Sequence, residues 1–431
     1  MRRNAFWSGF DAIVAAILSL VTSFAVARII GPAELGIGAA ATMLHVVLWV
    51  VTNALFADAI VQRAAMNNRV LSTAFWASIA VGCLAMLMQA AAGPGLAAMM
   101  GDHRLVTMSL VLAAPLPLVG AAGMIQGLLT RERAYRRLAL RTVLGQGLGT
   151  SVGVWAACAG AGAWALVWQQ AVGSGIGALA ILLGRRWKPR PCFDFAAVRS
   201  LLAIGLPLTA STLVLIVRYR LFAMLIGASA GAQVLGQVHI AFRLVETVRE
   251  LTFSALWRLM LPALSEHQHD RQAMLKQVDR WLRLCAIVVF PLCTVLAIAL
   301  SQIVTVLLGP DWLVASQATL PLIALMAWSA LTFPSGVALI AVGKARFALY
   351  ANMAGLVGAC TAVLVQRPTS PWQAVMIWTV SQILVSPYSI WVNARALGVS
   401  MIRPLTGGFG TQPRAMTPAR PPIFTSGISR R

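Results

Sequence analysis

Twelve long apolar stretches run through this chain of 431 residues and restrict what it can fold into. Hydrophobic residues make up 59% of the chain and charged residues only 11%. So few charges could not cover the surface of a water-soluble protein of this size. Unbroken runs such as AIVAAILSLVTSFAVA reach the length of about 20 apolar residues that a membrane-spanning helix needs. The sequence therefore predicts a protein whose main solvent is lipid.

Helices are expected rather than barrel strands, because barrel strands alternate apolar and polar residues over about ten positions. A helix also satisfies its own backbone hydrogen bonds in hydrocarbon. The fifth and sixth spans are separated only by the turn Gly160-Ala161-Gly162, and the eighth span is unusually polar. The predicted fold class is an all-α integral membrane protein with about twelve transmembrane helices. We predict spans at residues 8–29, 36–61, 71–93, 105–129, 141–160, 162–184, 199–227, 235–262, 282–308, 315–342, 346–365 and 372–397.

The net charge of +22 is unevenly distributed over the loops that join these spans. Of the 34 Lys and Arg residues, 26 fall on one predicted side of the membrane, three on the other and five inside spans. Such an excess marks the cytoplasmic side, so both termini are expected in the cytoplasm. The positive charge is then explained by topology and by contact with anionic membrane lipids. A nucleic-acid partner is not expected.

Sequence motifs for catalysis, cofactors or metals are not found. The chain has no Walker loop, and its six cysteines are scattered without the spacing of a metal site or a disulfide framework. His267 and His269 lie close together, but no thiol or carboxylate accompanies them at ligand spacing. We therefore predict no cofactor, no metal and no enzymatic activity.

Two halves of the chain resemble each other. Gly31 and Gly36 follow the first span in the way that Gly227 and Gly236 follow the seventh, at offsets of 196 and 200 residues. An even number of spans in each half would relate the halves by an axis along the membrane normal. The predicted organisation is a six-helix lobe at 1–184, a basic cytoplasmic linker at 185–198, a second six-helix lobe at 199–398 and a disordered cytoplasmic tail at 399–431.

Ionisable residues inside the spans are candidates for function, because they are costly in lipid. At 100° per residue, His239, Arg243, Glu246 and Glu250 fall within about 60° of arc on the eighth span. This polar side of the helix has two interpretations. In the structural one, it forms internal ion pairs of Arg243 with Glu246 and of Glu246 with Arg249. In the functional one, it provides the cationic lining of a cavity. The candidate substrate-binding residues are Arg218, Arg220, Arg243, Arg249, Arg258 and His239.

Arginines in a transport cavity suit an anionic substrate. A guanidinium group holds phosphate through paired, charge-assisted hydrogen bonds and stays charged at every working pH. Arg218 and Arg220 are two positions apart, so at most one of them is expected to face the cavity. A coupling H⁺ or Na⁺ would need a carboxylate. The candidates are Glu246, Glu250, Asp11 and Asp58.

Three stretches carry a resemblance to a known family: ARIIGPAELGIGAA, LGQVHIAFRLVETVRELTFSALWRLMLPALSEHQHD and LLGPDWLVASQATLPLIAL. In this order, across about 300 residues, they resemble the Wzx-type polysaccharide-unit flippases of the multidrug/oligosaccharidyl-lipid/polysaccharide (MOP) exporter superfamily. The resemblance implies a bilobed bundle like that of the multidrug exporters (MATE-like) in a bacterial inner membrane. It also implies a cationic lumen. Between Arg28 and Arg104 the spans of this chain contain no Lys or Arg deep in the membrane, which departs from that pattern.

The implied activity is the flipping of an oligosaccharide on undecaprenyl pyrophosphate for O-antigen, capsule or exopolysaccharide synthesis. A polymerase and a chain-length regulator are the expected partners. The alternatives are a cation-coupled exporter of drugs or metabolites, a lipid II-type flippase, a membrane glycosyltransferase or polymerase, and a scaffold without transport. An exporter of cations would favour a carboxylate-lined cavity, and polymerases usually carry a large outer loop.

Overall fold

A computed structural model describes residues 2–63, 66–184, 187–267, 270–341 and 346–397, which are almost entirely helical. No strand occurs within these ranges. The helices are α1 (Arg2–Gln62), α2 (Asn68–Met100), α3 (Arg104–Ala113), α4 (Leu116–Arg131), α5 (Tyr135–Cys158), α6 (Trp164–Leu183), α7 (Phe195–Ser265), α8 (Arg271–Leu307), the 3₁₀ turn η1 (Pro310–Trp312), α9 (Leu313–Ala341), α10 (Arg346–Gln366) and α11 (Pro371–Leu397).

Eleven of the twelve predicted spans coincide with a helix or with part of one, and the span predicted at 105–129 is divided between α3 and α4. By length and composition, eight helical stretches of the described chain are apolar enough to cross a membrane. Helices α1 and α7 are long because each contains two predicted spans joined without a loop. The predicted tail at 399–431 lies outside the described residues, and the two-lobe division stays a prediction.

Glycine produces the bend in each of the two long helices. Gly31 in α1 has φ 77° and ψ 173°, and Gly231 in α7 has φ 85° and ψ 175°. A positive φ is readily adopted only by glycine. The residue equivalent to Gly31 is therefore Gly231, at an offset of 200 residues. The alignment of Gly31 with Gly227 was wrong, because Gly227 lies in regular helix.

Beyond the bends, α1 and α7 touch each other through a reciprocal glycine contact. A Cβ on Gly36 would lie 1.8 Å from the carbonyl oxygen of Ala232, and a Cβ on Gly236 would lie 1.9 Å from that of Pro32. The two contacts are equivalent, because Gly236 lies 200 positions after Gly36 and Ala232 lies 200 positions after Pro32. Only a residue without a side chain lets two helix backbones approach so closely, so these glycines fix where the helices cross.

Local chemistry also explains the other helix ends. Gly160 and Gly162 adopt φ 79° and 58°, and they separate α5 from α6 as predicted. The span predicted at 105–129 is interrupted at Ala114 and Pro115, between α3 and α4. Helix α7 begins at Phe195, four residues before the predicted 199, because the Asp194 side chain accepts hydrogen bonds from the first backbone amides.

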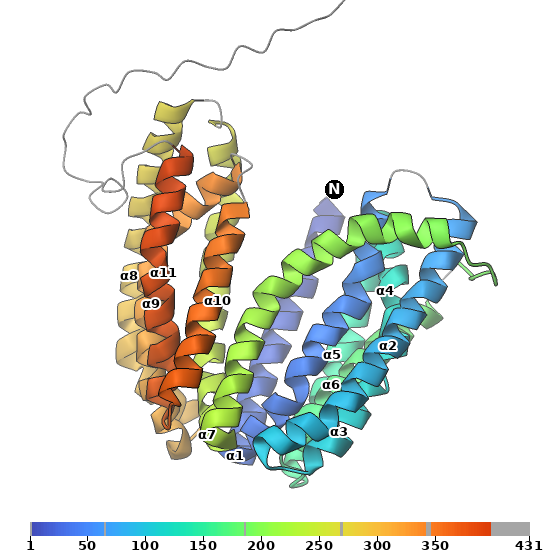
Figure 1. The fold of residues 1–431 in the computed structure, drawn as a ribbon, viewed down its shortest axis with the longest axis horizontal. Coiled ribbons are helices and arrows are strands. Elements are labelled where there is room, and N and C mark those ends of the chain that lie inside the picture. Colours follow the sequence, from blue (N-terminus) through green and yellow to red (C-terminus); the bar gives the residue numbers. More distant parts are fainter. Residues whose placement is uncertain (1, 64–65, 185–186, 268–269, 342–345, 398–431) are drawn as a thin grey trace, which may run out of the picture.

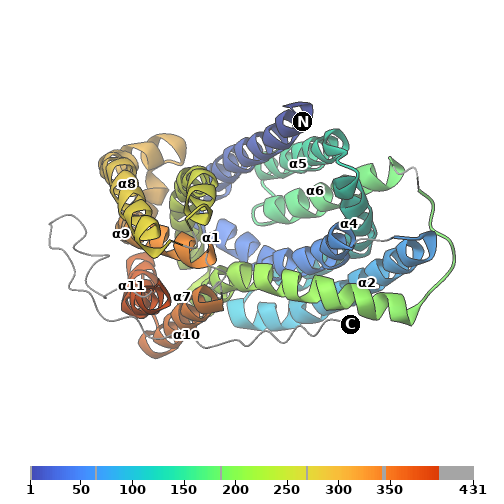
Figure 2. The ribbon, with the colours of Figure 1, turned by 90° about the horizontal axis from the view of Figure 1, so that it is seen from above.

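The helices form two groups, as Figure 1 shows. One group contains α1 to α6 and the other contains α8 to α11. The groups come together at the end that holds the bends of α1 and α7, and they diverge towards the opposite end. Helix α7 belongs to both, since it starts beside α2 and continues past its bend into the group of α8 to α11, as the view from above also shows (Figure 2).

Packing follows the same division. The largest cluster of buried apolar residues joins the second part of α7 with α8, α9, α10 and α11. A second cluster joins α1, α2, α4 and α6 with the start of α7, including Leu201. Gly205 of α7 sits so close to α1 that a Cβ would lie 1.9 Å from the carbonyl oxygen of Leu55. The two ends of α7 are thus fixed to different groups of helices.

Candidate substrate site

Two arginines predicted for the site meet around the aromatic ring of Tyr219. The Cζ atom of Arg220 lies 5.8 Å from the centre of this ring. The Tyr219 hydroxyl lies 3.4 Å from Nδ1 of His239, which belongs to the part of α7 beyond the bend. Arg243, one turn after His239, is close enough to Arg220 for their charges to interact. The bend at Gly231 therefore folds the seventh and eighth predicted spans onto one shared polar cluster.

Arg218 points to a different neighbour, which agrees with the expectation that it cannot share a face with Arg220. Its Cζ atom lies 5.2 Å from the centre of the Trp378 ring in α11. Its Nη1 donates a 3.4 Å hydrogen bond to Oε1 of Gln382, one turn further along α11. Stacking on an indole stabilises a guanidinium that is removed from water. Helix α11 thus supplies part of the site, and no sequence motif indicated this.

Arg249 forms the ion pair that the structural interpretation proposed. Its Nε and Nη2 atoms donate to the two carboxylate oxygens of Glu246, at 2.7 and 2.5 Å. In a bidentate pair of this kind, the guanidinium group and the carboxylate use their hydrogen bonds mainly for each other. Glu250 lies one turn further on, is exposed, and interacts electrostatically with Arg243 and Arg249. The cluster formed by Arg218, Tyr219, Arg220, His239, Arg243, Glu246, Arg249 and Glu250 is called the arginine cluster below.

The remaining predicted site residues lie elsewhere. Arg258 is exposed on α7, two turns beyond Glu250. Asp58 is half-buried near the end of α1. Asp11 lies within α1, in a part whose side chains are outside the described residues. Within the described ranges, no group of three or more His, Cys, Asp or Glu side chains could hold a metal ion.

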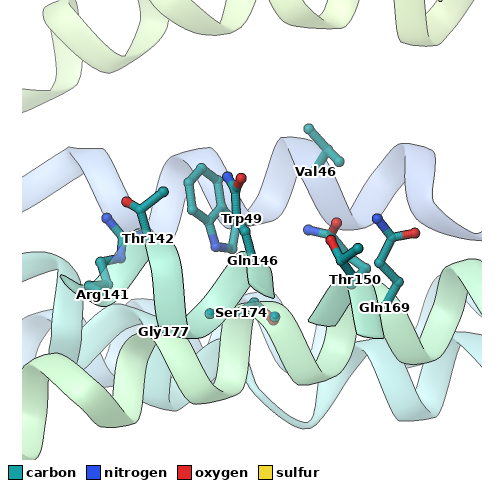
Figure 3. A pocket seen from close by; sticks show the side chains of 12 residues that line it. Val46, Trp49, Arg141, Thr142, Gln146, Thr150, Gln169, Ser174 and Gly177 are labelled. Atoms are coloured by element: carbon teal, nitrogen blue, oxygen red, sulfur yellow. The ribbon is translucent and has the colours of Figure 1, made fainter. Parts of the chain in front are cut away.

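A polar cavity in the first group of helices was missed by the sequence analysis. It measures about 350 Å³ and lies between α1, α5 and α6. Figure 3 shows the side chains gathered between α1 and the pair formed by α5 and α6. Arg141 lies nearly two turns inside α5, and its Nη1 donates a 2.5 Å hydrogen bond to Oε1 of Gln126 in α4. The lining residues are Val46, Trp49, Arg141, Thr142, Gly145, Gln146, Thr150, Gln169, Gln170, Gly173, Ser174 and Gly177.

A repeating polar pattern in α5 would have revealed this cavity. Thr142, Gln146 and Thr150 recur every four residues and span about 80° of arc. The exposed apolar residues Leu144, Leu148 and Trp155 cluster on the opposite side of the helix. In a bilayer the apolar side faces lipid, so the polar side must face protein or water.

The end of the molecule that holds the bends contains a second charged network. Arg104 contacts Asp102 at 2.8 Å and Glu34 at 2.9 Å, and Glu34 also accepts a 2.7 Å hydrogen bond from the backbone amide of Ala163. The hydrogen bond from Arg104 is the main reason that the pKa of Asp102 lies below its ordinary value. This network ties the bend of α1 to the α2–α3 and α5–α6 turns, which is a structural role.

Known proteins share both sequence and fold with this chain. A family model described as polysaccharide biosynthesis protein matches residues 25–317. The succinoglycan biosynthesis transport protein ExoT of Rhizobium meliloti is 22% identical over 310 residues, which are 72% of this chain and 63% of ExoT. The chain spans less than two thirds of the length of the curated relatives that it matches.

Solved transporters have the same arrangement of helices. The lipid II flippase MurJ in an inward closed conformation superimposes with a TM-score of 0.71, at 12% identity, over 95% of this chain and 94% of MurJ. An inward-facing MATE-family multidrug resistance transporter of the MOP superfamily superimposes with a TM-score of 0.64, at 14% identity. The match covers 89% of this chain and 96% of that transporter. The fold of this chain is the one that these two transporters share. The chain is therefore a multi-pass membrane protein with a MATE-like fold, and it belongs to the polysaccharide biosynthesis protein family.

Proposed function

We propose that this protein flips an oligosaccharide linked to undecaprenyl pyrophosphate from the cytoplasmic to the periplasmic leaflet of a bacterial inner membrane, for surface polysaccharide synthesis. The arginine cluster is the observation that carries this proposal. Family membership and the transport role in the name of ExoT support the substrate class. The predicted excess of positive loops supports the placement of both termini in the cytoplasm.

Of all parts of such a substrate, the charged pyrophosphate has the highest free-energy cost of removal from water. The guanidinium groups of the arginine cluster can replace its lost hydrogen bonds to water. Arg220 and Arg243 are close enough for their charges to interact, so their guanidinium groups can hold a doubly charged anion together. Arg218 adds a third positive charge from the α11 side. Arg249 is already bonded to Glu246 and contributes less. The apolar polyprenyl chain stays in lipid while the headgroup crosses.

Alternating access is the mechanism that we propose for this arrangement of helices. The two lobes predicted from the sequence, 1–184 and 199–398, would rock against each other about the α1–α7 contact. The helices meet at the end with the bends and diverge at the end that is predicted to face the cytoplasm (Figure 1), and we propose that the protein opens on that side. Binding of the headgroup between the lobes would favour closure at the open end.

A carboxylate near the arginines could couple transport to H⁺ or Na⁺. Glu250 is the better placed of the two acidic residues in the cluster, since Glu246 is held by Arg249. Asp58 and Asp11 lie outside the cluster. Neutralising Glu250 by Glu250→Gln should then reduce the response of transport to an imposed pH or Na⁺ gradient, while leaving downhill movement intact.

The test replaces the two arginines that lie together. In cells that depend on this protein for surface polysaccharide, the double variant R220A/R243A should lose polysaccharide and accumulate lipid-linked repeat units, with the protein still in the membrane. Lysines at both positions should retain part of the output, because charge remains and paired hydrogen bonds do not. Arg199→Ala, which removes an exposed arginine at the start of the same helix, is the matched control. Normal output from R220A/R243A contradicts the proposal.

A further inference from the structure

We infer that the polar cavity between α1, α5 and α6 is a sugar-binding subsite that holds the glycan of the substrate beside its pyrophosphate. This inference rests on the proposed function and extends it to a second site. The cavity is formed by Trp49, Thr142, Gln146, Thr150, Gln169, Gln170 and Ser174 together with Arg141. None of these residues belongs to the arginine cluster.

The chemistry of the lining selects a neutral polyhydroxylated ligand. Three glutamine amides and three hydroxyl groups each offer both a donor and an acceptor, as sugar hydroxyls do. None of the described lining residues carries a carboxylate, so an organic cation has no counter-charge here. The single arginine already donates to Gln126, so it cannot provide the multiple free positive charges of a phosphate site. Trp49 adds a flat apolar surface on which the C–H face of a sugar ring can stack.

The polar wall is built on a rigid backbone. Gly145 and Gly149 of α5 pack directly on α6, where a Cβ would lie 2.8 Å from the Gly173 carbonyl oxygen and 2.6 Å from that of Gln169. This close approach turns the Thr142, Gln146 and Thr150 side of α5 towards α1. Thr150 is also fixed by a 3.0 Å hydrogen bond from Thr22 of α1. Rigid helices position polar groups more accurately than loops do.

Exposure indicates that this wall faces water. Gln146 is exposed in the middle of a membrane helix, and it lies opposite the lipid-facing residues Leu144, Leu148 and Trp155. A glutamine amide that faced hydrocarbon would lose all its hydrogen bonds at a cost of several kcal/mol. The side of α5 that carries Gln146 therefore lines a hydrated path, along which a glycan can enter.

Helix α1 connects the subsite with the arginine cluster. Met43 of α1 belongs to a buried cluster against which Tyr219 packs. Val46 and Trp49, one and two turns further on the same helix, line the cavity. Six helical residues span about 9 Å, which is the length of one or two sugar rings. A headgroup held by Arg220 and Arg243 would thus direct its first sugars into the cavity.

Two probes of equal lipid length test the inference on the full-length protein in lipid nanodiscs. One is geranylgeranyl pyrophosphate, and the other is the same lipid carrying a neutral trisaccharide. The wild type should bind the sugar-bearing probe at least about tenfold more tightly, a factor that corresponds to about 1.4 kcal/mol. The double variant Q146L/Q169L should lose this difference and keep its affinity for the bare lipid. Ser151→Leu is the matched control, because Ser151 is exposed on another side of α5 and bonds only within its own helix.

The outcomes separate this inference from the proposed function. Equal affinity of the wild type for both probes, or an equal loss for both in Q146L/Q169L, overturns the sugar subsite and leaves the pyrophosphate site standing. Failure of the wild type to bind either probe overturns the proposed function. Both sites are supported together if R220A/R243A loses binding of the bare lipid and if the sugar-dependent difference is lost in Q146L/Q169L but kept in Ser151→Leu.

Discussion

A Cβ placed on Gly36 would lie 1.8 Å from the backbone carbonyl oxygen of Ala232, and this contact sets the crossing of α1 and α7. The same contact recurs between Gly236 and Pro32. The two glycines therefore fix the place where α1 and α7 cross.

Alanine at both positions should push the two helices apart. We expect G36A/G236A to lower the unfolding free energy by about 1–3 kcal/mol for each overpacked site and to reduce transport. Thermal unfolding in detergent measures the first effect and polysaccharide output the second. Gly147→Ala is the control, since no described atom lies within 4 Å of a Cβ there. It should be neutral or slightly stabilising, and a similar loss in this control would contradict the assigned contact.

Arg28 connects the two groups of helices at the end with the bends. Its Nη1 donates to the carbonyl oxygens of Val306 at 2.9 Å and Leu307 at 3.3 Å, at the end of α8. A positive charge at a helix C-terminus contributes about 0.3–1 kcal/mol. Arg28→Ala should therefore shift the protein towards a conformation open at this end, and Arg28→Lys should shift it less.

Two spin labels can measure that shift in a variant that keeps only the two labelled cysteines and has its other cysteines replaced. Cys158 and a cysteine introduced at Val314 are both exposed near this end. A distance distribution that is broader and longer in Arg28→Ala than in the wild type is the expected result. Identical distributions would show that the hydrogen bonds of Arg28 do not hold this end closed.

Glu246 neutralises Arg249, so its removal should release an arginine into the cluster. We expect Glu246→Gln to bind geranylgeranyl pyrophosphate several-fold more tightly and to release it more slowly, because Arg249 becomes available to the pyrophosphate. Equilibrium binding and off-rates in nanodiscs measure both effects. Glu266→Gln, at the end of the same helix, is the control. Weaker binding in Glu246→Gln would mean that the pair positions the other arginines instead.

Asp102 makes stability depend on pH at the end with the bends. Arg104 lowers the pKa of this carboxyl below its ordinary value of 3.8. A lowered folded-state pKa gives stability that is present above the unfolded value and is lost as the pH falls through the folded one. The ion pair is partly exposed, so we expect an effect of at most about 1 kcal/mol. Melting temperatures between pH 6 and pH 3 should fall more steeply in the wild type than in Asp102→Asn. If the melting temperatures of the two proteins fell in parallel with pH, the Asp102–Arg104 pair would not contribute to the pH dependence of stability.

The predictions that depended on local patterns agree with the structure. Hydropathy placed each of the twelve predicted spans in helical chain, with a break at Ala114 and Pro115 in one of them, because a run of about 20 apolar residues is a property of each segment. Helical periodicity placed His239 and Arg243 on one side, because that spacing is fixed by helix geometry. Gly160 and Gly162 marked a turn, because glycine adopts a positive φ at little cost.

The arrangement of the site depended on which helices pack together, and no local pattern contains that information. Trp378 stacks on Arg218 from 160 positions away, and the cavity of α5 and α6 is completed by Trp49 of α1. The sequence alone determined a helical membrane protein with arginines in its interior. Only the tertiary structure decided which arginines meet, because side-chain volume and backbone approach at positions such as Gly36 and Gly236 select one packing of the helices among many with the same hydropathy.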